Sequence, residues 1–288
     1  MKISNIIKAY NINEVTQALS ENKGKATLIA GGTDIMIKLR SKEVSHSVLI
    51  DVSDVAEMKN INISDDEITI GAAVTFTEIV SSNEIKKALP GLWEACSLVG
   101  AKQIRNTGTI GGNAANGSPA ADSIPPLLAL GAKVVIVSKS EEKIIDIDDF
   151  FLGKGKTALE EDAVIKEFII PMYGKKFRII GFDKLGLRNA LAISRISSAV
   201  SLEVEDSIIK GAKVASGALG TIPTVEKKMG EFLVGKPLKE DTIKEASDYF
   251  SDIVAERLKG RSSAEFKQEA VKGVITKALD KAFKQIEI

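Results

Sequence analysis

The chain has 288 residues, of which 44% are hydrophobic and 27% charged, and its 39 Lys and Arg residues balance its 39 Asp and Glu residues. A globular chain of this length has room for about two domains, and zero net charge without a basic block excludes an electrostatic footprint for nucleic acid. The single cysteine, Cys96, and the single histidine, His46, exclude an intrachain disulfide and an iron–sulfur cluster and argue against a His/Cys zinc site.

The first 52 residues predict a small unit of helix, strand, helix and strand. The first helix carries Val15 and Leu19 on one face, with Asn11 or Asn13 as its cap. The order strand, glycine turn, helix and strand is typical of a βαβ unit. The expected strands cover residues 26–30 and 48–51, and the expected second helix covers 35–40.

The following part predicts a hairpin, helices and one long loop. Asp65 and Asp66 form the hairpin turn, and Thr75 with Glu78 has the spacing of a capping box that opens a helix. Pro90 and Gly91 separate this helix from the next. The segment 107–126 is rich in Gly, Ala, Asn, Ser and Pro and predicts an extended loop, which in compact domains is often functional. The expected strands cover 61–64, 67–71, 133–138, 144–147 and 164–170, and the second helix covers 92–101.

The last third predicts an antiparallel sheet followed by helices. Pro171–Lys176 has the composition of a linker, so we place a domain boundary near Tyr173. Turn residues around Gly211 indicate an antiparallel sheet, and the Lys- and Glu-rich helices from Glu226 onward predict solvated amphipathic faces. The expected strands cover 197–205 and 208–214, and the expected helices cover 225–234, 243–258 and 264–286.

The first candidate site is the glycine segment Ala30–Asp34, which follows a strand and precedes a helix. Paired glycines permit a positive φ and a close approach of the backbone to a ligand. Consecutive N–H groups at a helix start bind anions such as a diphosphate, and Thr33 adds a hydroxyl. A tight turn capped by Thr33 or Asp34 explains the same residues without a ligand.

The second candidate site is the glycine segment Thr109–Asn113, which lies within a run of small residues from Ile104 to Asp122. Small residues at this density leave room for a large flat group or for close packing of the backbone. Asp122 can accept a hydrogen bond from a ribose or ribityl hydroxyl. A buried irregular connection is the alternative, but two separate glycine pairs favour one long ligand held at its middle.

These motifs together resemble the FAD-binding subunit of molybdenum hydroxylases, a family that includes the flavin subunits of xanthine, carbon monoxide and nicotinate dehydrogenases. The resemblance spans almost the whole chain. It is carried by AGGTD at 30–34, IRNTGTIGGN at 104–113, SPAAD at 118–122, PLLALGAKV at 126–134, FDKLGLRNALAISRISSAV at 182–200 and RSSAEFKQEAVKGVITKAL at 261–279.

The resemblance implies an α+β fold with FAD held between two subdomains. The FAD-binding PCMH-type domain would cover 1–172, with subdomains of about 1–55 and 56–172. A C-terminal domain, 173–288, would be a small antiparallel sheet packed with helices.

The resemblance also implies cofactor contacts, carried over position by position. The first glycine segment would wrap the diphosphate, and the second would lie against the diphosphate and the flavin. Asp122 matches an FAD contact, Lys184 a basic cofactor contact, and Val99 and Ile165 apolar or backbone contacts. The implied FAD-binding residues are Leu28, Ile29, Ala30, Gly31, Gly32, Thr33, Asp34, Ile35, Val99, Thr109, Ile110, Gly111, Gly112, Asn113, Asp122, Ile165 and Lys184.

The function implied is electron transfer within a complex. Partner chains would carry the molybdopterin and the [2Fe-2S] clusters, the assembly would be (αβγ)2, and FAD would pass electrons to NAD or another acceptor such as ferredoxin or a quinone. A xanthine dehydrogenase-like complex is the first expectation; carbon monoxide, nicotinate and aromatic acyl-CoA substrates remain open. Attachment should be noncovalent, because Cys96 is expected in a buried helix and His46 in a polar loop.

No side-chain nucleophile, general base or metal ligand is needed, although Lys184 and Arg188 can tune the flavin or meet phosphates of the acceptor. With no apolar run of ~18–20 residues and no signal-peptide pattern, we expect a cytoplasmic protein without a membrane partner. Two alternatives remain: a stand-alone FAD-dependent oxidoreductase of the same flavin-binding architecture, and a cofactor-free scaffold in which the glycine segments are structural.

Overall fold

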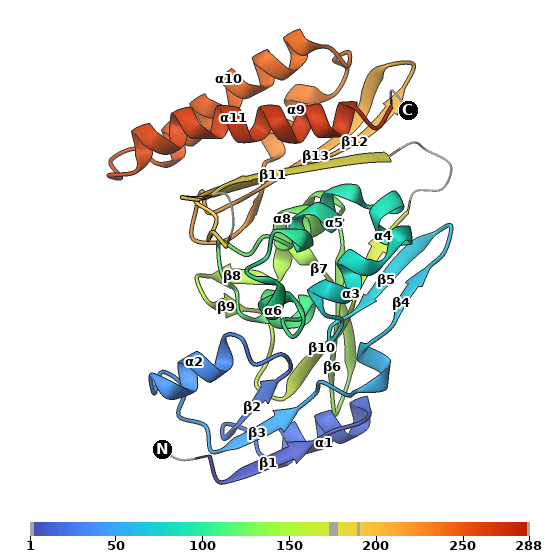
Figure 1. Cartoon of the computed structure of the whole chain (residues 1–288), viewed down its shortest axis with the longest axis vertical. Helices are drawn as coiled ribbons and strands as arrows, with labels where there is room; N and C mark the ends of the chain where they lie inside the picture. Colours follow the sequence, from blue (N-terminus) through green and yellow to red (C-terminus); the bar gives the residue numbers. More distant parts are fainter. Residues whose placement is uncertain (1–2, 173–177, 189–190, 287–288) are drawn as a thin grey trace.

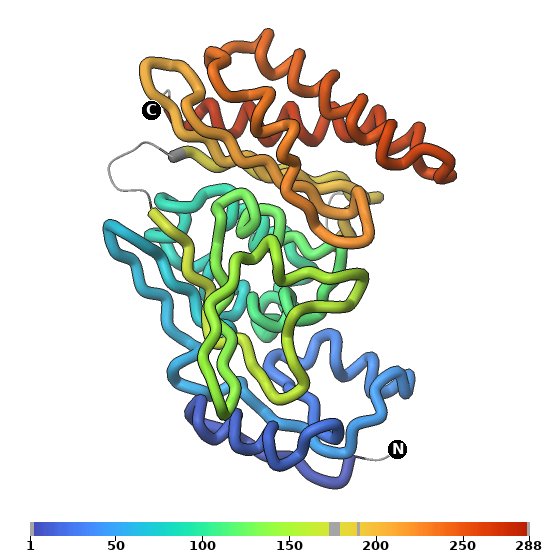
Figure 2. Tube along the Cα trace, turned by 180° about the vertical axis from the view of Figure 1, so that it is seen from behind, coloured from blue at the N-terminus to red at the C-terminus, as the bar shows by residue number. Residues whose placement is uncertain are grey.

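Three sheets are stacked along the long axis of the molecule, with helices between and around them (Figure 1). The computed structural model describes residues 3–172, 178–188 and 191–286. The chain starts at one end of this stack and finishes at the other, as the view from behind also shows (Figure 2). The predicted α+β class is confirmed.

The N-terminal layer is a three-stranded parallel sheet in the order β1-β3-β2. Asn11 caps its first helix by accepting a hydrogen bond from the Glu14 N–H group at 2.9 Å, and Val15 and Leu19 are buried as predicted. The parallel pairing of β2 with β3 confirms the βαβ unit. The elements are β1 (Asn5–Lys8), which the sequence analysis did not predict, α1 (Ile12–Glu21), β2 (Ala26–Ile29), α2 (Ile35–Arg40) and β3 (Val48–Asp51).

The middle layer is a five-stranded antiparallel sheet in the order β4-β5-β10-β6-β7, flanked by short helices. The predicted hairpin and the capping box of Thr75 and Glu78 are both present. The strands are β4 (Ile61–Ile63), β5 (Glu67–Gly71), β6 (Lys133–Ser138), β7 (Glu142–Asp146) and β10 (Ala163–Pro171), with a small pair β8 (Phe151–Gly153) and β9 (Lys156–Thr157) beside them. The helices are α3 (Phe76–Ser81), α4 (Asn83–Ala88), α5 (Pro90–Ser97), α6 (Lys102–Arg105), α7 (Ile110–Ala115) and α8 (Ile124–Ala129).

Two predictions in this layer were wrong in their boundaries. Helix α5 begins at Pro90 instead of after it, because proline fits the first helical position, where no N–H donor is needed. The same helix stops at Ser97, and Gly100 then takes a φ of 46°. The segment 107–126 is not one loop, since it contains α7 and the start of α8.

The C-terminal layer is a four-stranded antiparallel sheet in the order β11-β12-β13-β14. Helices α9, α10 and α11 cover its outer face, and α5 and α8 pack against its inner face. Strand β12 is therefore buried on both sides over most of its length. The elements are β11 (Arg178–Leu185), β12 (Ile196–Glu205), β13 (Ile208–Gly217), β14 (Thr224–Val225), α9 (Lys227–Leu233), α10 (Glu240–Arg257) and α11 (Ala264–Phe283).

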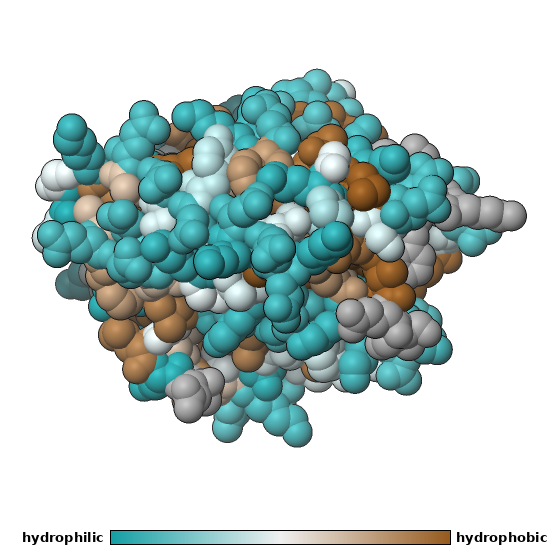
Figure 3. All heavy atoms as spheres, turned by 90° about the horizontal axis from the view of Figure 1, so that it is seen from above, coloured by the Kyte–Doolittle hydropathy of each residue, from teal (hydrophilic) through white to brown (hydrophobic). Residues whose placement is uncertain are grey.

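The outer surface of this layer is mostly hydrophilic, as the view from above shows (Figure 3). This agrees with the solvated helix faces predicted from Glu226 onward. The turn between β12 and β13 lies at Asp206 and Ser207, both at positive φ, and not at Gly211, which is inside β13. The predicted boundary near Tyr173 lies outside the described residues, and Pro171, the first linker residue, ends β10.

Two apolar clusters form the core. One fills the first two layers and reaches Phe182 and Ala199 of the C-terminal sheet, and the other lies between that sheet and α9 to α11. None of the helices within the described residues is long and apolar enough to cross a lipid bilayer.

Candidate functional site

A cavity of about 300 Å³ lies where the two glycine segments meet. Its volume is at the lower end of the range of roughly 300–1,000 Å³ that is typical of ligand sites. The segments are far apart in sequence, but the backbone of the first lies against the residues directly before the second: a Cβ atom on Gly31 would lie 1.8 Å from the Thr107 carbonyl oxygen. Only glycine permits this approach, so the predicted convergence of the two segments is a feature of the fold.

Most of the predicted cofactor-binding residues line this cavity, and four do not. On the wall are Leu28, Ala30, Gly31, Gly32, Thr33, Asp34, Ile35, Val99, Thr109, Gly111, Gly112, Asn113 and Ile165. Outside the wall are Ile29, Ile110, Asp122 and Lys184. Ile29 is the last residue of β2, and Ile110 is fully buried in the core.

The first glycine segment leaves its main-chain donors unused. Gly32 has a φ of 72°, which turns the chain out of β2. Among the described residues, no hydrogen bond has a donor in the main-chain N–H groups from Gly31 to Ile35. Helix α2 has only six residues, and Asp34 at its start makes no side-chain cap. The anion-binding potential of this segment therefore rests on the free N–H groups themselves.

The second glycine segment uses its main-chain donors within the protein. The N–H groups of Ile110 and Gly111 donate to Val74 and Ala72 at 3.0 and 2.9 Å, and that of Gly112 donates to the Thr109 hydroxyl at 3.1 Å. A Cβ atom on Gly111 would lie 2.5 Å from the Ala72 side chain. This glycine pair thus permits close packing of α7 on the chain after β5. From Ile110 to Asn113 the second segment therefore has no unused main-chain donor for a ligand, unlike the first segment.

Polar groups on the wall include two that the sequence analysis missed. Lys38 of α2 donates a hydrogen bond of 2.6 Å to the side chain of Asn116, directly after α7. Both residues line the cavity, so this contact joins the helices that follow the two glycine segments. Lys38 lies one helical turn beyond the predicted motif, on the same face as Asp34. The four-residue spacing between Asp34 and Lys38 was therefore the signal by which the sequence could have indicated Lys38 as a cavity residue.

The remaining wall is apolar. Val99 and Ile165, which were predicted, lie there with Phe76, Ile104 and Val164, which were not. These side chains come from different elements and enter the wall only through tertiary packing. An apolar wall beside a run of free N–H groups suits a ligand with a flat aromatic part and an anionic part.

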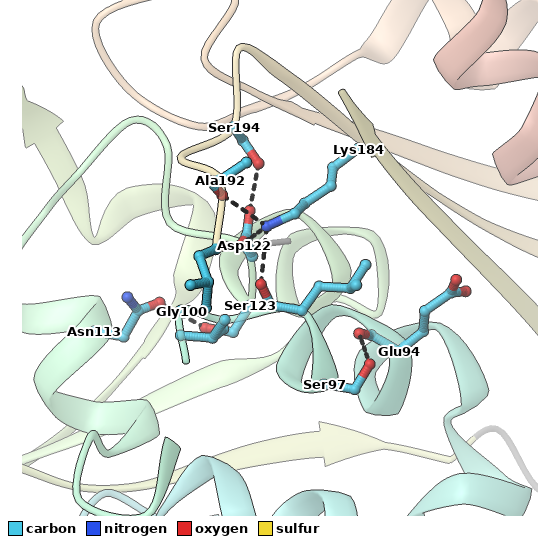
Figure 4. A network of polar contacts seen from close by, with 12 residues as sticks. Glu94, Ser97, Gly100, Asn113, Asp122, Ser123, Lys184, Ala192 and Ser194 are labelled. Atoms are coloured by element: carbon cyan, nitrogen blue, oxygen red, sulfur yellow. Dashed lines mark hydrogen bonds and ion pairs between the residues drawn. The ribbon is translucent and has the colours of Figure 1, made fainter. Parts of the chain in front are cut away.

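Asp122 and Lys184 form a buried ion pair behind the wall (Figure 4). The Lys184 ammonium donates to Asp122 Oδ2 at 2.6 Å and to the carbonyl oxygens of Leu98 and Ala192 at 3.0 and 3.2 Å. Ser194 donates to the other Asp122 oxygen at 2.5 Å. The network joins the middle layer to the C-terminal layer, one residue away from the cavity residue Val99.

Burial is the largest influence on the pKa values of Asp122 and Cys96. It raises the pKa of Asp122, and the charge of Lys184 and the hydrogen bonds from Lys184 and Ser194 oppose that rise. Burial also raises the pKa of the Cys96 thiol, with a further contribution from Asp122, so the thiol is held in its unreactive protonated form. Neither Cys96 nor His46 lies on the cavity wall.

Comparison with known proteins covers nearly the whole chain. A family model described as "FAD binding domain in molybdopterin dehydrogenase" matches residues 2–173, and "CO dehydrogenase flavoprotein C-terminal domain" matches residues 183–282. The chain is 34% identical over 264 residues to the nicotinate dehydrogenase FAD-subunit of Eubacterium barkeri, covering 90% of this chain and 89% of that one. It is 29% identical over 276 residues to the xanthine dehydrogenase FAD-binding subunit of Escherichia coli O157:H7, covering 96% and 94%. Its fold matches a chain of Cu,Mo-CO dehydrogenase with a TM-score of 0.90 at 24% identity, covering 99% of each chain.

Proposed function

The chain belongs to the family of FAD-binding subunits of molybdopterin-dependent dehydrogenases, and from that premise we propose that it is the electron-transfer flavoprotein of a molybdenum hydroxylase complex. It accepts electrons from an iron–sulfur subunit and passes them to NAD or another acceptor. With a single cysteine, the chain cannot hold the iron–sulfur relay itself. The complex therefore needs separate chains for the relay and for the molybdopterin.

The cavity suits FAD on the observations of this chain alone. The free N–H groups from Gly31 to Ile35 would hold the diphosphate, and the Thr33 hydroxyl adds one donor beside them. Val99, Ile104 and Ile165 would cover the flat ring system. Because neither Cys96 nor His46 lies on the wall, attachment is noncovalent. Asp122 and Lys184 do not line the cavity, so they would affect the cofactor indirectly, by holding together the elements that they join.

Bound FAD supplies the conversion between single-electron and two-electron transfer. The chain's own residues bind and orient the cofactor. The apolar side chains of the wall exclude water from it, and the buried Lys184–Asp122 ion pair fixes the chain segments next to the wall. No side chain of the wall has to act as a nucleophile or general base.

The proposal extends to the assembly and the substrate. We propose an (αβγ)2 complex in the cytoplasm that oxidises a nitrogen heteroaromatic compound. A purine, as for xanthine dehydrogenase, is the first candidate. The relative named as a nicotinate dehydrogenase subunit, at 34% identity, adds a pyridine carboxylate as the second.

The run of unpaired N–H groups at the meeting point of the two glycine segments is the observation that carries this proposal. The test is to purify the chain together with its neighbouring subunits, measure acid-released FAD per chain, and add xanthine or nicotinate without oxygen. We expect about one FAD per chain and bleaching of the flavin absorbance. A colourless complex that takes up no added FAD would support the cofactor-free scaffold instead. Turnover of a substrate by this chain alone would support the stand-alone oxidoreductase.

A further inference from the structure

The turn that follows α5, residues 98–100, carries part of the apolar wall of the cavity, and we call it the wall turn. Leu98 is the C-cap of α5, and Gly100 takes a φ of 46°. Val99 in this turn lines the cavity, and so does Ile104 of α6, a helix that begins at Lys102 directly beyond the turn. The positions of both apolar side chains therefore depend on the conformation of the wall turn.

All three carbonyl oxygens of the wall turn accept a hydrogen bond from a cation. Lys184 donates to the Leu98 oxygen at 3.0 Å. The Nη1 atom of Arg105 donates to the oxygens of Val99 and Gly100, at 3.1 Å in each case. Carbonyl groups at the end of a helix have no partner within it, and the helix dipole favours positive charge there. The wall turn is thus held by one cation from β11 and one from α6.

The two cations differ in what else they hold. Lys184 is also paired with Asp122, so its loss would break the contact between the middle and C-terminal layers. Arg105 forms no ion pair within the described ranges, and both of its side-chain hydrogen bonds there go to the wall turn. A substitution of Arg105 therefore acts on the wall turn without breaking the buried ion pair.

The far end of α6 is held by contacts of its own. The side chain of Asn106 accepts a hydrogen bond from the Thr77 hydroxyl at 2.7 Å, and the Gly108 oxygen accepts one from the Phe76 N–H group at 3.0 Å. Between them lies Thr107, whose backbone Gly31 approaches closely. The apolar wall and the segment with the free N–H groups are thus fixed by separate sets of contacts.

We propose that Arg105 is a positioning residue for the flavin ring of FAD, and that it acts through the wall turn on Val99 and Ile104. It does not line the cavity, so its effect passes through the two carbonyl oxygens that it holds. The diphosphate, at the first glycine segment, does not depend on it. This inference rests on the proposed function, because it assigns a residue to the flavin end of the cavity.

The test compares FAD with ADP, which contains the adenosine and diphosphate of FAD but no flavin. Arg105→Met keeps a long side chain and removes its hydrogen-bond donors. On the full-length chain freed of FAD, we expect this variant to weaken FAD binding about tenfold and to change ADP binding by less than about twofold. Flavin fluorescence titration measures the first affinity, and calorimetry measures the second.

The absorption band of bound flavin gives a readout that a merely structural role would leave unchanged. With FAD at saturation, Arg105→Met should show less vibrational structure in this band than the wild type, because a displaced wall lets water reach the ring. Arg105→Lys keeps a charged donor on a long side chain. It should restore part of the FAD affinity and part of the band structure.

Gly100→Ala disturbs the same turn by a different route. The φ of 46° disfavours a side chain at this position, and an added Cβ atom would lie 3.0 Å from Cγ2 of Ile104. We expect the same pattern, with weaker FAD binding and ADP binding within about twofold of the wild type. Lys102→Met removes an exposed cation of α6 that does not line the cavity. It is the matched control and leaves both affinities unchanged.

Three results would overturn the proposal. The first is equal weakening of FAD and ADP binding by Arg105→Met. The second is an FAD affinity within about twofold of the wild type with an unchanged band; a lower free energy of unfolding in urea would then show a structural role alone. The third is a wild-type chain that binds FAD but no ADP, since the diphosphate would not be held independently of the ring. If Arg105→Met does not fold, Arg105→Lys and Gly100→Ala decide by the same criteria.

Failure of this inference is distinguishable from failure of the proposed function. A wild-type chain that binds FAD, in a complex whose flavin is bleached by substrate, supports the proposed function whatever the Arg105 variants show. Unchanged FAD affinity and an unchanged band in those variants then reject only the role of Arg105. A wild-type chain that binds no FAD rejects the proposed function and this inference together.

Discussion

From Gly31 to Ile35 the main-chain N–H groups have no partner among the described residues, whereas from Ile110 to Asn113 each N–H group donates to the protein itself. The first glycine pair lies between β2 and the start of α2, and the second lies in the first turn of α7, directly after the extended cap residue Thr109. In the first, glycine lets the chain turn and press against Thr107 while its donors stay free. In the second, glycine lets α7 pack on Ala72. A glycine pair therefore indicates that the backbone lies close to a neighbouring segment. Whether its N–H groups are already hydrogen-bonded within the protein decides whether they can bind a ligand.

Gly31→Ala should have the largest effect. The added Cβ atom would lie 1.8 Å from the Thr107 carbonyl oxygen, so the two segments must separate. Overpacking of this kind costs about 1–3 kcal/mol, and here the displacement falls on the FAD site. We expect FAD affinity to fall about 100-fold, equivalent to about 2.7 kcal/mol, measured by flavin fluorescence titration.

Gly273→Ala is the control for this experiment. It lies inside α11 with no heavy atom within 4 Å of an added Cβ atom and no positive φ. It should leave FAD affinity unchanged and raise helix stability by up to about 1 kcal/mol. If Gly31→Ala binds FAD as tightly as this control, the first glycine segment does not hold the cofactor.

Gly111→Ala should damage folding more than binding. Its Cβ atom would lie 2.5 Å from the Ala72 Cβ and 2.6 Å from the Ala72 oxygen. We expect the free energy of unfolding to fall by about 1–3 kcal/mol without FAD, measured in urea, and FAD affinity of the folded protein to fall less than about tenfold. A loss of affinity as large as that of Gly31→Ala, at unchanged stability, would remove the distinction between the two segments.

Local sequence signals predicted the elements that have strong caps or a clear period. The capping box at Thr75 and Glu78, the Asn11 cap and the strands β2 and β3, which flank the first glycine segment and α2, all lie where expected. Strand β1 was missed because Ile6 is 66% exposed and the strand forms only by pairing with β3, whose residues lie 43 positions further along. Strand β11 was missed because it forms by pairing with β12 and by packing against helices on both of its faces, and neither contact is visible in its own sequence.

The sequence predicted those residues of the candidate site that belong to short continuous segments. Both glycine segments were named from their motifs, and Val99 and Ile165 from the family resemblance; all of these residues except Ile110 lie on the cavity wall. Phe76 and Val164 reach the wall through tertiary packing, whereas Lys38 and Ile104 lie next to the predicted glycine segments and were not named as site residues. Asp122 and Lys184 were each predicted as an FAD contact, not as partners of one another; in the structure one ion pair and two main-chain carbonyls hold the lysine behind the wall. Whether they contact FAD stays a prediction.

Lys38→Gln tests the contact that bridges the two glycine segments. Lys38 is the cation on the cavity wall, and its ammonium bonds to Asn116 at 2.6 Å. Removing a charged hydrogen-bond donor near a diphosphate should weaken FAD binding about tenfold, with less than about 0.5 kcal/mol change in the free energy of unfolding of the FAD-free chain. Arg40→Gln, on the exposed side of the same helix, is the control. Equal effects of the two substitutions would assign the loss to general surface charge.

The smallest expected effects come from a matched pair of threonines. The Thr109 hydroxyl accepts the Gly112 N–H bond at 3.1 Å and caps α7, whereas the Thr33 hydroxyl bonds to no other described residue. Thr109→Val should therefore lower the free energy of unfolding by about 1 kcal/mol and leave FAD affinity nearly unchanged. Thr33→Val should leave stability within about 0.5 kcal/mol and weaken FAD binding by about two- to tenfold. Urea unfolding and flavin titration on both variants measure the contrast directly. If both threonines change stability and neither changes affinity, the first segment is a capped turn like the second, and the free N–H groups alone do not mark a ligand site.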